Sequence, residues 1–205
     1  MNEPMAETVP VILASASRVR SRILENSGVN HRCIPSSVDE DEIKIRMNED
    51  GADVESVALA LAEAKAKVVA RNQPDAIVIG ADQILECDGR WFDKPPDRKA
   101  AAETLRVLRG RTHRLICAAV VFRGEECLWR YLVKPNQTMR SFGDGFLENY
   151  LDATSPDILE SVGAYRLEGS GVQLFSRIDG DYFTILGLPL LALLEFLRGS
   201  DVLAK

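Results

Sequence analysis

Hydrophobic and polar residues alternate along this chain between runs of strand length and stretches with helical spacing. The first apolar run, Val9 to Ala14, is typical of a buried strand, and from Ser17 the apolar positions recur with helical spacing until Gly28. The pattern therefore predicts that the chain begins with a strand, a tight turn and a helix.

The same alternation continues to the end of the sequence. A long helix is expected from Asp53, whose side chain suits an N-cap, to about Asn72, and the Asp88-Gly89 pair suits a two-residue hairpin turn. The other expected strands are His31 to Pro35, Ala76 to Gly80, the hairpin Ile84 to Trp91, Leu115 to Phe122, Cys127 to Val133, and further strands after Gly169 to Gly171; the other expected helices are Asp97 to Gly110, Phe146 to Leu151 and Pro189 to Leu197. Strands alternating with helices predict an α/β protein with a mixed twisted sheet and flanking helices.

Composition limits the number of domains and the class of partner. The 205 residues are 46% hydrophobic and 27% charged, which is enough to bury one sizeable core or two small lobes. We find no repeat or linker and expect a single domain over 1–205. The net charge of −6 opposes binding to nucleic acid or an anionic membrane, so any bound anion must meet a local basic pocket.

Cysteine usage and hydropathy indicate the compartment. The four cysteines are far apart and show no zinc-binding spacing, which favours a reducing cytosol; they are Cys33, Cys87, Cys117 and Cys127. Residues 1–15 lack a signal-peptide pattern, and the most apolar stretch, Phe183 to Leu197, is interrupted by Pro189 and Glu195. We expect a cytoplasmic protein without a membrane span.

Hydroxyls and guanidiniums gather at the first strand-to-helix junction, in the segment Leu13 to Arg22. Ser15, Ser17 and Arg20 lie where free N–H groups and the helix dipole would favour a phosphate, although the Walker glycines and lysine are absent. The alternative is a serine-capped surface helix with solvated arginines.

Lys65 lies near the centre of an apolar stripe of the long predicted helix. The stripe is formed by Val54, Val57, Ala58, Leu61 and Val68. Burying an unpaired ammonium costs too much, so Lys65 must snorkel, find a carboxylate or meet a bound anion. The sequence leaves these alternatives open.

Asp82 is the strongest single candidate for chemistry. It follows the predicted buried strand Ala76 to Gly80, and the C-terminal ends of strands are where α/β proteins usually assemble their sites; the alternative is a turn aspartate. The acidic stretch Asp39 to Glu42 suits a solvated loop or helix start, but a carboxylate there could join Asp82 around a hard cation. The two histidines, His31 and His113, suit structural roles and offer no catalytic triad.

Eight short motifs together resemble the Maf-like family of nucleotide pyrophosphatases. The family pattern runs L-A-S-x-S-P-R-R, V-D-E, A-x-x-K-A, A-D-T or S-D-Q, K-P, G-x-T-H, G-A-Y-x-[IL]-[QE]-G and G-L-P. The corresponding segments, in the same order between residue 11 and about 198, are Leu13 to Arg20, Val38 to Glu40, Ala62 to Ala66, Ala81 to Gln83, Lys94-Pro95, Gly110 to His113, Gly163 to Gly169 and Gly187 to Pro189.

The resemblance implies a fold, a reaction and roles for particular residues. It implies two α/β lobes around a cleft, a Mg²⁺ or Mn²⁺ ion, and hydrolysis of a nucleoside triphosphate between its α and β phosphates. Asp82 would be the general base and a metal ligand, and Glu40 would help to position the cation or water. The triphosphate would be held by Ser15, Ser17, Arg20, Lys65 and Lys94.

One departure from the family pattern affects the base of the nucleotide. The family has proline and then arginine or tryptophan where this chain has Arg18 and Val19. Family members that prefer 7-methyl-GTP have tryptophan, glutamine and glutamate at the positions that read the base. The corresponding residues of this chain are Val19, Gln83 and Glu168. Two of the three match, and the carboxylate of Glu168 suits the N–H donors of guanine better than the carbonyls of a pyrimidine.

Two other functions are compatible with parts of the sequence. One is a pyrophosphatase of the inosine-triphosphate type, whose motifs match less well. The other is a nucleotide-binding regulator of cell division with little turnover, since the family name derives from a septation phenotype. The expected partner is the nucleotide substrate, and the sequence leaves the formation of a homodimer open.

Overall fold

The computed structural model describes residues 9–154 and 156–204, which form two compact units. Unit 1 comprises residues 9–82, 118–132 and 187–204, and unit 2 comprises residues 83–117 and 133–186. Residues 1–8, on which part of the signal-peptide expectation depends, lie outside the described residues. In the described part of the chain no helix is long and apolar enough to span a membrane.

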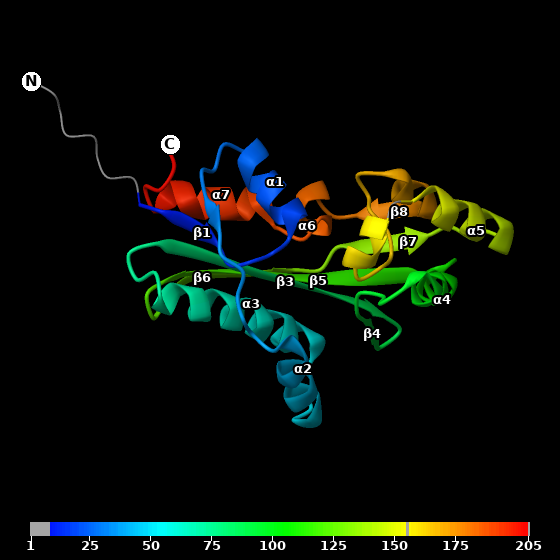
Figure 1. The fold of residues 1–205 in the computed structure, drawn as a ribbon, viewed down its shortest axis with the longest axis horizontal. Helices are drawn as coiled ribbons and strands as arrows, with labels where there is room; N and C mark the ends of the chain where they lie inside the picture. Colours follow the sequence, from blue (N-terminus) through cyan, green and yellow to red (C-terminus); the bar gives the residue numbers. More distant parts are fainter. Residues whose placement is uncertain (1–8, 155, 205) are drawn as a thin grey trace, which may run out of the picture. The chain divides into compact units, whose positions relative to one another are not determined.

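Unit 1 is built on a sheet with helices on both faces. Its strands are β1 (Val11–Leu13), β2 (Arg32–Cys33), most of β6 (Glu126–Val133), and parts of β3 (Ile77–Cys87) and β5 (Thr112–Arg123). Its helices are α1 (Arg18–Asn26), α2 (Glu40–Glu49), α3 (Val54–Arg71) and α7 (Leu190–Gly199). In Figure 1, α3 covers one face of these strands, and α1 and α7 cover the other.

Unit 2 combines the remaining strands with shorter helices. It holds the other parts of β3 and β5 together with β4 (Arg90–Phe92), β7 (Asn136–Met139) and β8 (Phe175–Asp179). Its helices are α4 (Arg98–Leu108), α5 (Asp144–Ala153) and α6 (Tyr182–Ile185), with 3₁₀ turns η1 (Pro156–Glu160) and η2 (Ser170–Leu174).

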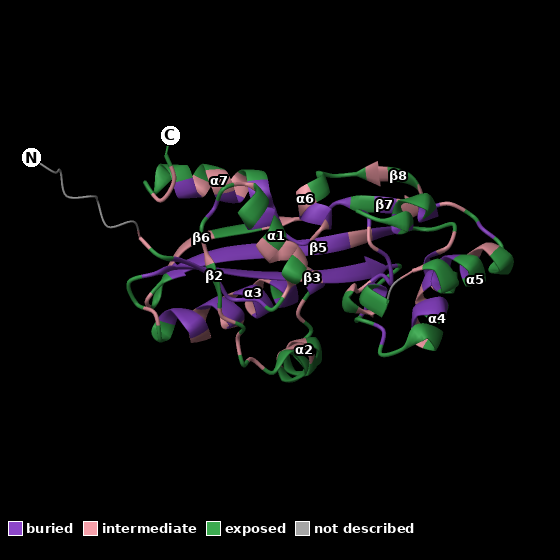
Figure 2. Ribbon diagram, turned by 45° about the horizontal axis from the view of Figure 1, so that its top comes forward, coloured by how far each residue is buried: buried purple, intermediate pink, exposed green. Residues whose placement is uncertain are grey.

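The sheet is mixed, as the sequence predicts. Its order is β2-β1-β3-β5-β7-β8, with β4 paired to β3 and β6 paired to β5. Strand β1 is parallel to β2 and to β3, whereas β3 with β4, β5 with β7, and β7 with β8 are antiparallel. Strands β3 and β5 are buried along almost their whole length (Figure 2).

Capping residues fix the helix starts where the sequence predicts them. Asp53 accepts a hydrogen bond from the backbone N–H of Ser56 at the start of α3, and this helix ends with Asn72 as its C-cap. Asp97 caps α4 and Ser17 caps α1 in the same way. Each cap satisfies an N–H group that the helix leaves without a partner, so these boundaries are local properties of the sequence.

The acidic stretch forms the start of the solvated helix α2. Asp39 is its N-cap, the first turn holds Glu40, Asp41 and Glu42, and the helix has no buried residue. Acidic side chains are favourable at this end because they face the positive pole of the helix dipole. The expected helix start is therefore confirmed.

The predicted end of the strand before Asp82 is wrong. Strand β3 runs from Ile77 to Cys87, so Asp82 lies in its middle. Gly80 does not break the strand; a Cβ there would lie 2.3 Å from the backbone oxygen of Ala62 on α3, so this glycine permits close helix packing. Beyond Asp82 the strand continues because it pairs with β4.

The predicted hairpin is confirmed, and it is formed by the second half of β3 and by β4. Cys87 pairs with Arg90, and the two residues between them, Asp88 and Gly89, have φ angles of 51° and 79°. Positive φ at both central positions matches the twist of the flanking strands, which is why this dipeptide suits the turn.

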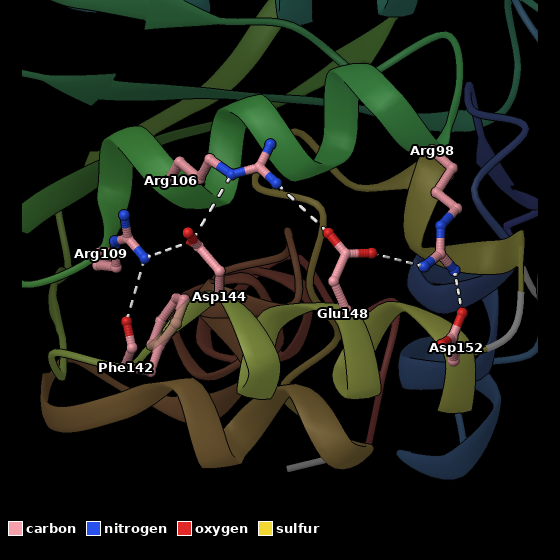
Figure 3. Close-up of polar contacts among 7 residues, drawn as sticks. All are labelled: Arg98, Arg106, Arg109, Phe142, Asp144, Glu148 and Asp152. Atoms are coloured by element: carbon pink, nitrogen blue, oxygen red, sulfur yellow. Dashed lines mark hydrogen bonds and ion pairs between the residues drawn. The ribbon is translucent and has the colours of Figure 1, made fainter.

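Helices α4 and α5 of unit 2 face each other through a ladder of opposite charges (Figure 3). Arg109 lies 2.8 Å from Asp144, Arg106 lies 3.3 Å from Glu148, and Arg98 bridges Glu148 at 3.0 Å and Asp152 at 2.8 Å. The acids recur every four residues and therefore share one face of α5. Apart from the half-buried Arg109 these side chains are exposed, so each pair contributes little to stability by itself.

Candidate active site

The centre of the candidate site is an ion pair between Lys65 on α3 and Asp82 on β3. Lys65 Nζ lies 2.6 Å from Asp82 Oδ1, and the two residues are 7% and 6% exposed. Of the alternatives left open for the lysine, the structure shows a carboxylate partner. The partner satisfies an ammonium that could not be buried alone.

Glu40 joins this pair from the first residue of α2. Its Oε1 lies 2.8 Å from Lys65 Nζ, so the carboxylates of Asp82 and Glu40 share one ammonium. Their oxygens can be no further apart than the sum of these two N–O distances. The acid from the solvated helix thus meets the buried acid of β3, as the sequence suggested for a cation site.

The loop between β1 and α1 is connected through Arg20 to the strand that carries Asp82. Ser15 is buried and its Oγ accepts from the backbone N–H of Ser17 and from Arg20 Nη1. Arg20 also donates to two backbone carbonyls at 2.8 Å, those of Ala81, the neighbour of Asp82, and of Gly187. Arg20 therefore braces the loop against the strand that carries Asp82.

Gly187 is required where it stands. Its φ is +101°, and a Cβ at this position would lie 3.2 Å from Arg20 Nε. A side chain would strain the backbone and crowd the guanidinium, so glycine permits the bond from Arg20 to its carbonyl.

The donor set of the cluster fits a hard divalent cation. In the described residues no three His, Cys, Asp or Glu side chains gather as a complete protein site would require. Mg²⁺ is usually held by one or two carboxylates, with waters and substrate phosphates completing the shell. Asp82 and Glu40 match that arrangement. They do not match a site in which the protein supplies most of the ligands.

The other predicted site residues belong to unit 2. Gln83 Nε2 donates to the backbone carbonyls of Thr184 at 3.0 Å and Ile185 at 3.3 Å. Because carbonyls only accept, the amide nitrogen must face them, and Oε1 is the end that remains for a ligand. Lys94 is exposed and follows β4 in the chain. Glu168 forms an ion pair with Arg166, two residues before it.

The structure therefore gathers one set of predicted residues and leaves the others in unit 2. Lys65, Asp82 and Glu40 are in direct contact, and Ser15 and Arg20 reach the backbone next to Asp82. The sequence reasoning did not identify Arg166 or Thr184, which hold Glu168 and Gln83. The spacing of Arg166 and Glu168, two residues apart, is the signal that could have indicated the first.

A buried polar relay in unit 2 accounts for His113. Tyr165 Oη donates to Gln137 Oε1 at 2.8 Å and lies 2.9 Å from His113 Nε2. The single hydroxyl proton goes to Gln137, so His113 Nε2 must be the donor to Tyr165 and Nδ1 carries no proton. Burial lowers the pKa of His113 from 6.5 to about 4 and raises that of Tyr165 above its ordinary value. His113 is thus neutral, which fits the structural role expected for it.

The candidate site of unit 1 is formed by charged side chains, a buried lysine shared by two carboxylates. Residues 10–200 match the sequence model of a family described as Maf-like protein. The chain belongs to this family.

Relatives cover almost the whole chain. One from Granulibacter bethesdensis, named nucleoside triphosphate pyrophosphatase, is 48% identical over 94% of this chain and 98% of its own length. One from Rhizobium meliloti, named 7-methyl-GTP pyrophosphatase, is 49% identical over 92% of this chain and 94% of its own. A crystal structure of a nucleoside-triphosphatase / dITP/XTP pyrophosphatase from Mycobacterium abscessus has a TM-score of 0.42 and 16% identity, with 95% of this chain and 96% of that chain covered.

Proposed function

We propose that this chain is a nucleoside triphosphate pyrophosphatase that cuts the bond between the α and β phosphates and releases a nucleoside monophosphate and pyrophosphate. The observation that carries the proposal is the buried Asp82 carboxylate, held by Lys65 beside Glu40. The names of full-length relatives at 48% and 49% identity support the same reaction. Its cellular role would be to clear modified or non-standard nucleotides.

Asp82 is assigned as the general base. Its carboxylate accepts a proton from a water that attacks the phosphorus, and the electron pair of the broken P–O bond leaves with pyrophosphate. Lys65 is placed to orient the carboxylate through its 2.6 Å contact. A fixed acceptor matters because phosphoryl transfer depends on positioning and charge neutralisation more than on covalent chemistry.

The triphosphate is assigned to the cations and hydroxyls that the family resemblance points to. Lys65 would contact phosphate while it remains beside Asp82, and Ser15, Ser17 and Arg20 would supply donors at the start of α1, where the helix dipole favours an anion. Lys94 is assigned to the same ligand by the resemblance, and its exposure leaves the ammonium accessible.

A Mg²⁺ or Mn²⁺ ion is part of the proposal, with Asp82 and Glu40 as its protein ligands. The sharing of one ammonium by both carboxylates supports this assignment, because the same oxygens suit a hard cation. When bound, such an ion neutralises phosphate charge and lowers the pKa of a coordinated water.

A guanine-type base is the proposed specificity. Gln83 offers the acceptor Oε1, since its amide nitrogen is held by two carbonyls, and Glu168 offers a carboxylate. Guanine presents N–H donors where uracil and thymine present carbonyls. Val19 provides no aromatic surface for a methylated ring, so we expect modest discrimination between 7-methyl-GTP and GTP.

The remaining assignments concern location and partners. We propose a cytoplasmic protein that acts on free nucleotides, not on nucleic acid or a membrane, which the net charge of −6 and four cysteines without disulfides support. The proposed reaction requires neither a homodimer nor a role in septation.

Pyrophosphate release by the purified protein tests the proposal. The expected result is sustained turnover of nucleoside triphosphates that stops on chelation and returns with Mg²⁺ or Mn²⁺, with monophosphate as the second product. A panel of GTP, 7-methyl-GTP, UTP, dTTP and ITP gives the specificity. Binding without turnover would instead support the regulator, and a strong preference for ITP would support the inosine-triphosphate type.

A further inference from the structure

The guanidinium of Arg166 contacts a single oxygen of the Glu168 carboxylate. Its Nε lies 2.9 Å and its Nη2 2.8 Å from the same oxygen, Glu168 Oε1, while its Nη1 lies 3.0 Å from Asp157 Oδ2. All three nitrogens of the guanidinium are therefore engaged by carboxylates. In the described residues Glu168 Oε2 has no hydrogen-bond donor, so one oxygen is saturated and the other is left for a ligand.

The pair is half-buried, unlike an ordinary surface pair. The side chains of Arg166 and Glu168 are 28% and 24% exposed. Unit 2 contains a second pair with the same spacing, Arg177 and Asp179, whose side chains are 71% and 49% exposed. A partly desolvated contact through two nitrogens holds its geometry better than a solvated one. The exposed pair of Arg177 and Asp179 is therefore a matched comparison within the same unit.

The backbone around Glu168 is held without the Arg166 side chain. Tyr165 is anchored by Gln137 and His113 through its hydroxyl, and Tyr150 Oη donates to the carbonyl of Ala164 at 3.2 Å. Ala164 has a φ of +56°, which a non-glycine residue adopts at a cost that the surrounding contacts must offset. The segment thus keeps its path when the guanidinium is removed.

Close packing adds to this restraint. A Cβ at Gly163 would lie 2.1 Å from the ring of Tyr165, and one at Gly171 would lie 2.5 Å from the backbone oxygen of Arg166. The backbone of Arg166 is therefore enclosed by its neighbours, which leaves its side chain available to orient Glu168.

We propose that Arg166 is a specificity-determining positioning residue, which saturates Glu168 Oε1 and directs Oε2 to an N–H donor of the nucleotide base. This inference rests on the proposed function and refines it, because it assigns the contact with the base to one oxygen of Glu168. Gln83 is restrained by the same principle, since two carbonyls fix its amide and leave Oε1 outward. Both base-reading side chains then present acceptors whose direction is set by a neighbour, which favours a base edge rich in donors.

The test compares Arg166→Met, Arg177→Met and Glu168→Gln with the unmodified protein in kcat and KM for GTP and UTP. A base contact formed equally in the ground state and the transition state affects KM. For Arg166→Met we expect the GTP to UTP ratio of kcat/KM to fall about tenfold, mainly through KM for GTP, as loss of one oriented hydrogen bond to a charged group predicts. Glu168→Gln should lower the ratio similarly, and Arg177→Met should leave it unchanged.

Different failures point to different errors. If the unmodified protein releases no pyrophosphate, the proposed function is wrong and the inference falls with it. If the protein is active but Arg166→Met keeps the original ratio while Glu168→Gln lowers it, Arg166 does not position Glu168. If neither variant changes the ratio, Glu168 does not read the base. Equal losses for GTP and UTP, together with a lower melting temperature, would show that Arg166 only stabilises the fold.

Discussion

Lys65 Nζ and Asp82 Oδ1 lie 2.6 Å apart in the interior of unit 1, where neither charge could be buried alone. The helix α3 supplies the lysine and the strand β3 supplies the aspartate, 17 residues further along the chain. Glu40 completes the cluster from a solvated helix, so two acids of different exposure share one ammonium. This relationship makes the roles of the two buried residues separable by mutation.

Asp82→Asn should keep the fold and remove most turnover. The amide preserves shape but cannot accept the proton of the attacking water, and loss of a general base typically lowers kcat by about 10²–10⁴-fold. Pyrophosphate release and thermal melting of the same sample measure both properties.

Asp88→Asn is the matched control for this variant. Asp88 lies on the same hairpin, is exposed, and has a φ of 51°, a conformation that asparagine tolerates. It should keep its turnover. Near-normal turnover in folded Asp82→Asn would remove Asp82 from the catalytic role.

Lys65→Met should weaken binding of the triphosphate and also lower stability. Methionine fits the apolar stripe, but Asp82 is left buried without its cation, and breaking such a pair costs about 3–5 kcal/mol. Chemical denaturation and calorimetric titration with a nucleotide measure the two effects. Lys67→Met, on the same helix, should change neither.

A double variant separates the charge from the packing. Lys65→Met combined with Asp82→Asn removes both members of the pair, so it should recover part of the stability lost in Lys65→Met. If the losses of the two single variants simply add in the double variant, the pair does not carry the effect.

Local signals account for what the sequence predicts correctly. Asp53 and Asp97 cap their helices through bonds that span three residues, and the Asp88-Gly89 turn depends on backbone preference alone. Such features need no information about distant parts of the chain. The family resemblance added the identity of Asp82, Lys65 and Glu40 as a set.

Long-range pairing accounts for what the sequence does not predict. Strand β7 (Asn136–Met139) is polar in sequence and was not expected, and it forms because β5 and β8 pair with its two edges. Strand β3 continues past Asp82 because β4 pairs with its second half. Whether Lys65 snorkels, pairs with a carboxylate or binds an anion likewise depends on long-range contacts. The fold brings Asp82 and Glu40 to it.

Asp144→Asn should have only a small, salt-dependent effect on unit 2. Asp144 lies 2.8 Å from Arg109 and 3.8 Å from Arg106 at the start of α5 (Figure 3). Exposed pairs contribute about 0–1 kcal/mol and are screened by salt. The difference from the unmodified protein in urea denaturation should therefore nearly vanish in concentrated salt; a large difference that persists there would indicate a packing role.

Because His113 is buried in its neutral form, the protein should lose stability as the pH falls from about 6.5 to about 4. These two values are the ordinary pKa of histidine and the pKa of His113 in the folded protein. Burial lowers the folded pKa, so within this window the unfolded chain binds a proton that the folded chain does not. The stability contributed by the neutral ring is complete above the ordinary pKa, falls with pH through the window, and is constant again below the folded pKa. The full difference corresponds to about 3 kcal/mol, because one pKa unit is about 1.4 kcal/mol.

Carboxylates titrate in the same range, so the comparison must be with His113→Gln, which keeps a donor for Tyr165 but cannot be protonated. Between pH 7 and pH 4.5, denaturation of His113→Gln should show a loss of stability smaller than that of the unmodified protein by about 2–3 kcal/mol. Equal losses in the unmodified protein and in His113→Gln would mean that the buried ring accepts a proton in the folded state as readily as in the unfolded chain.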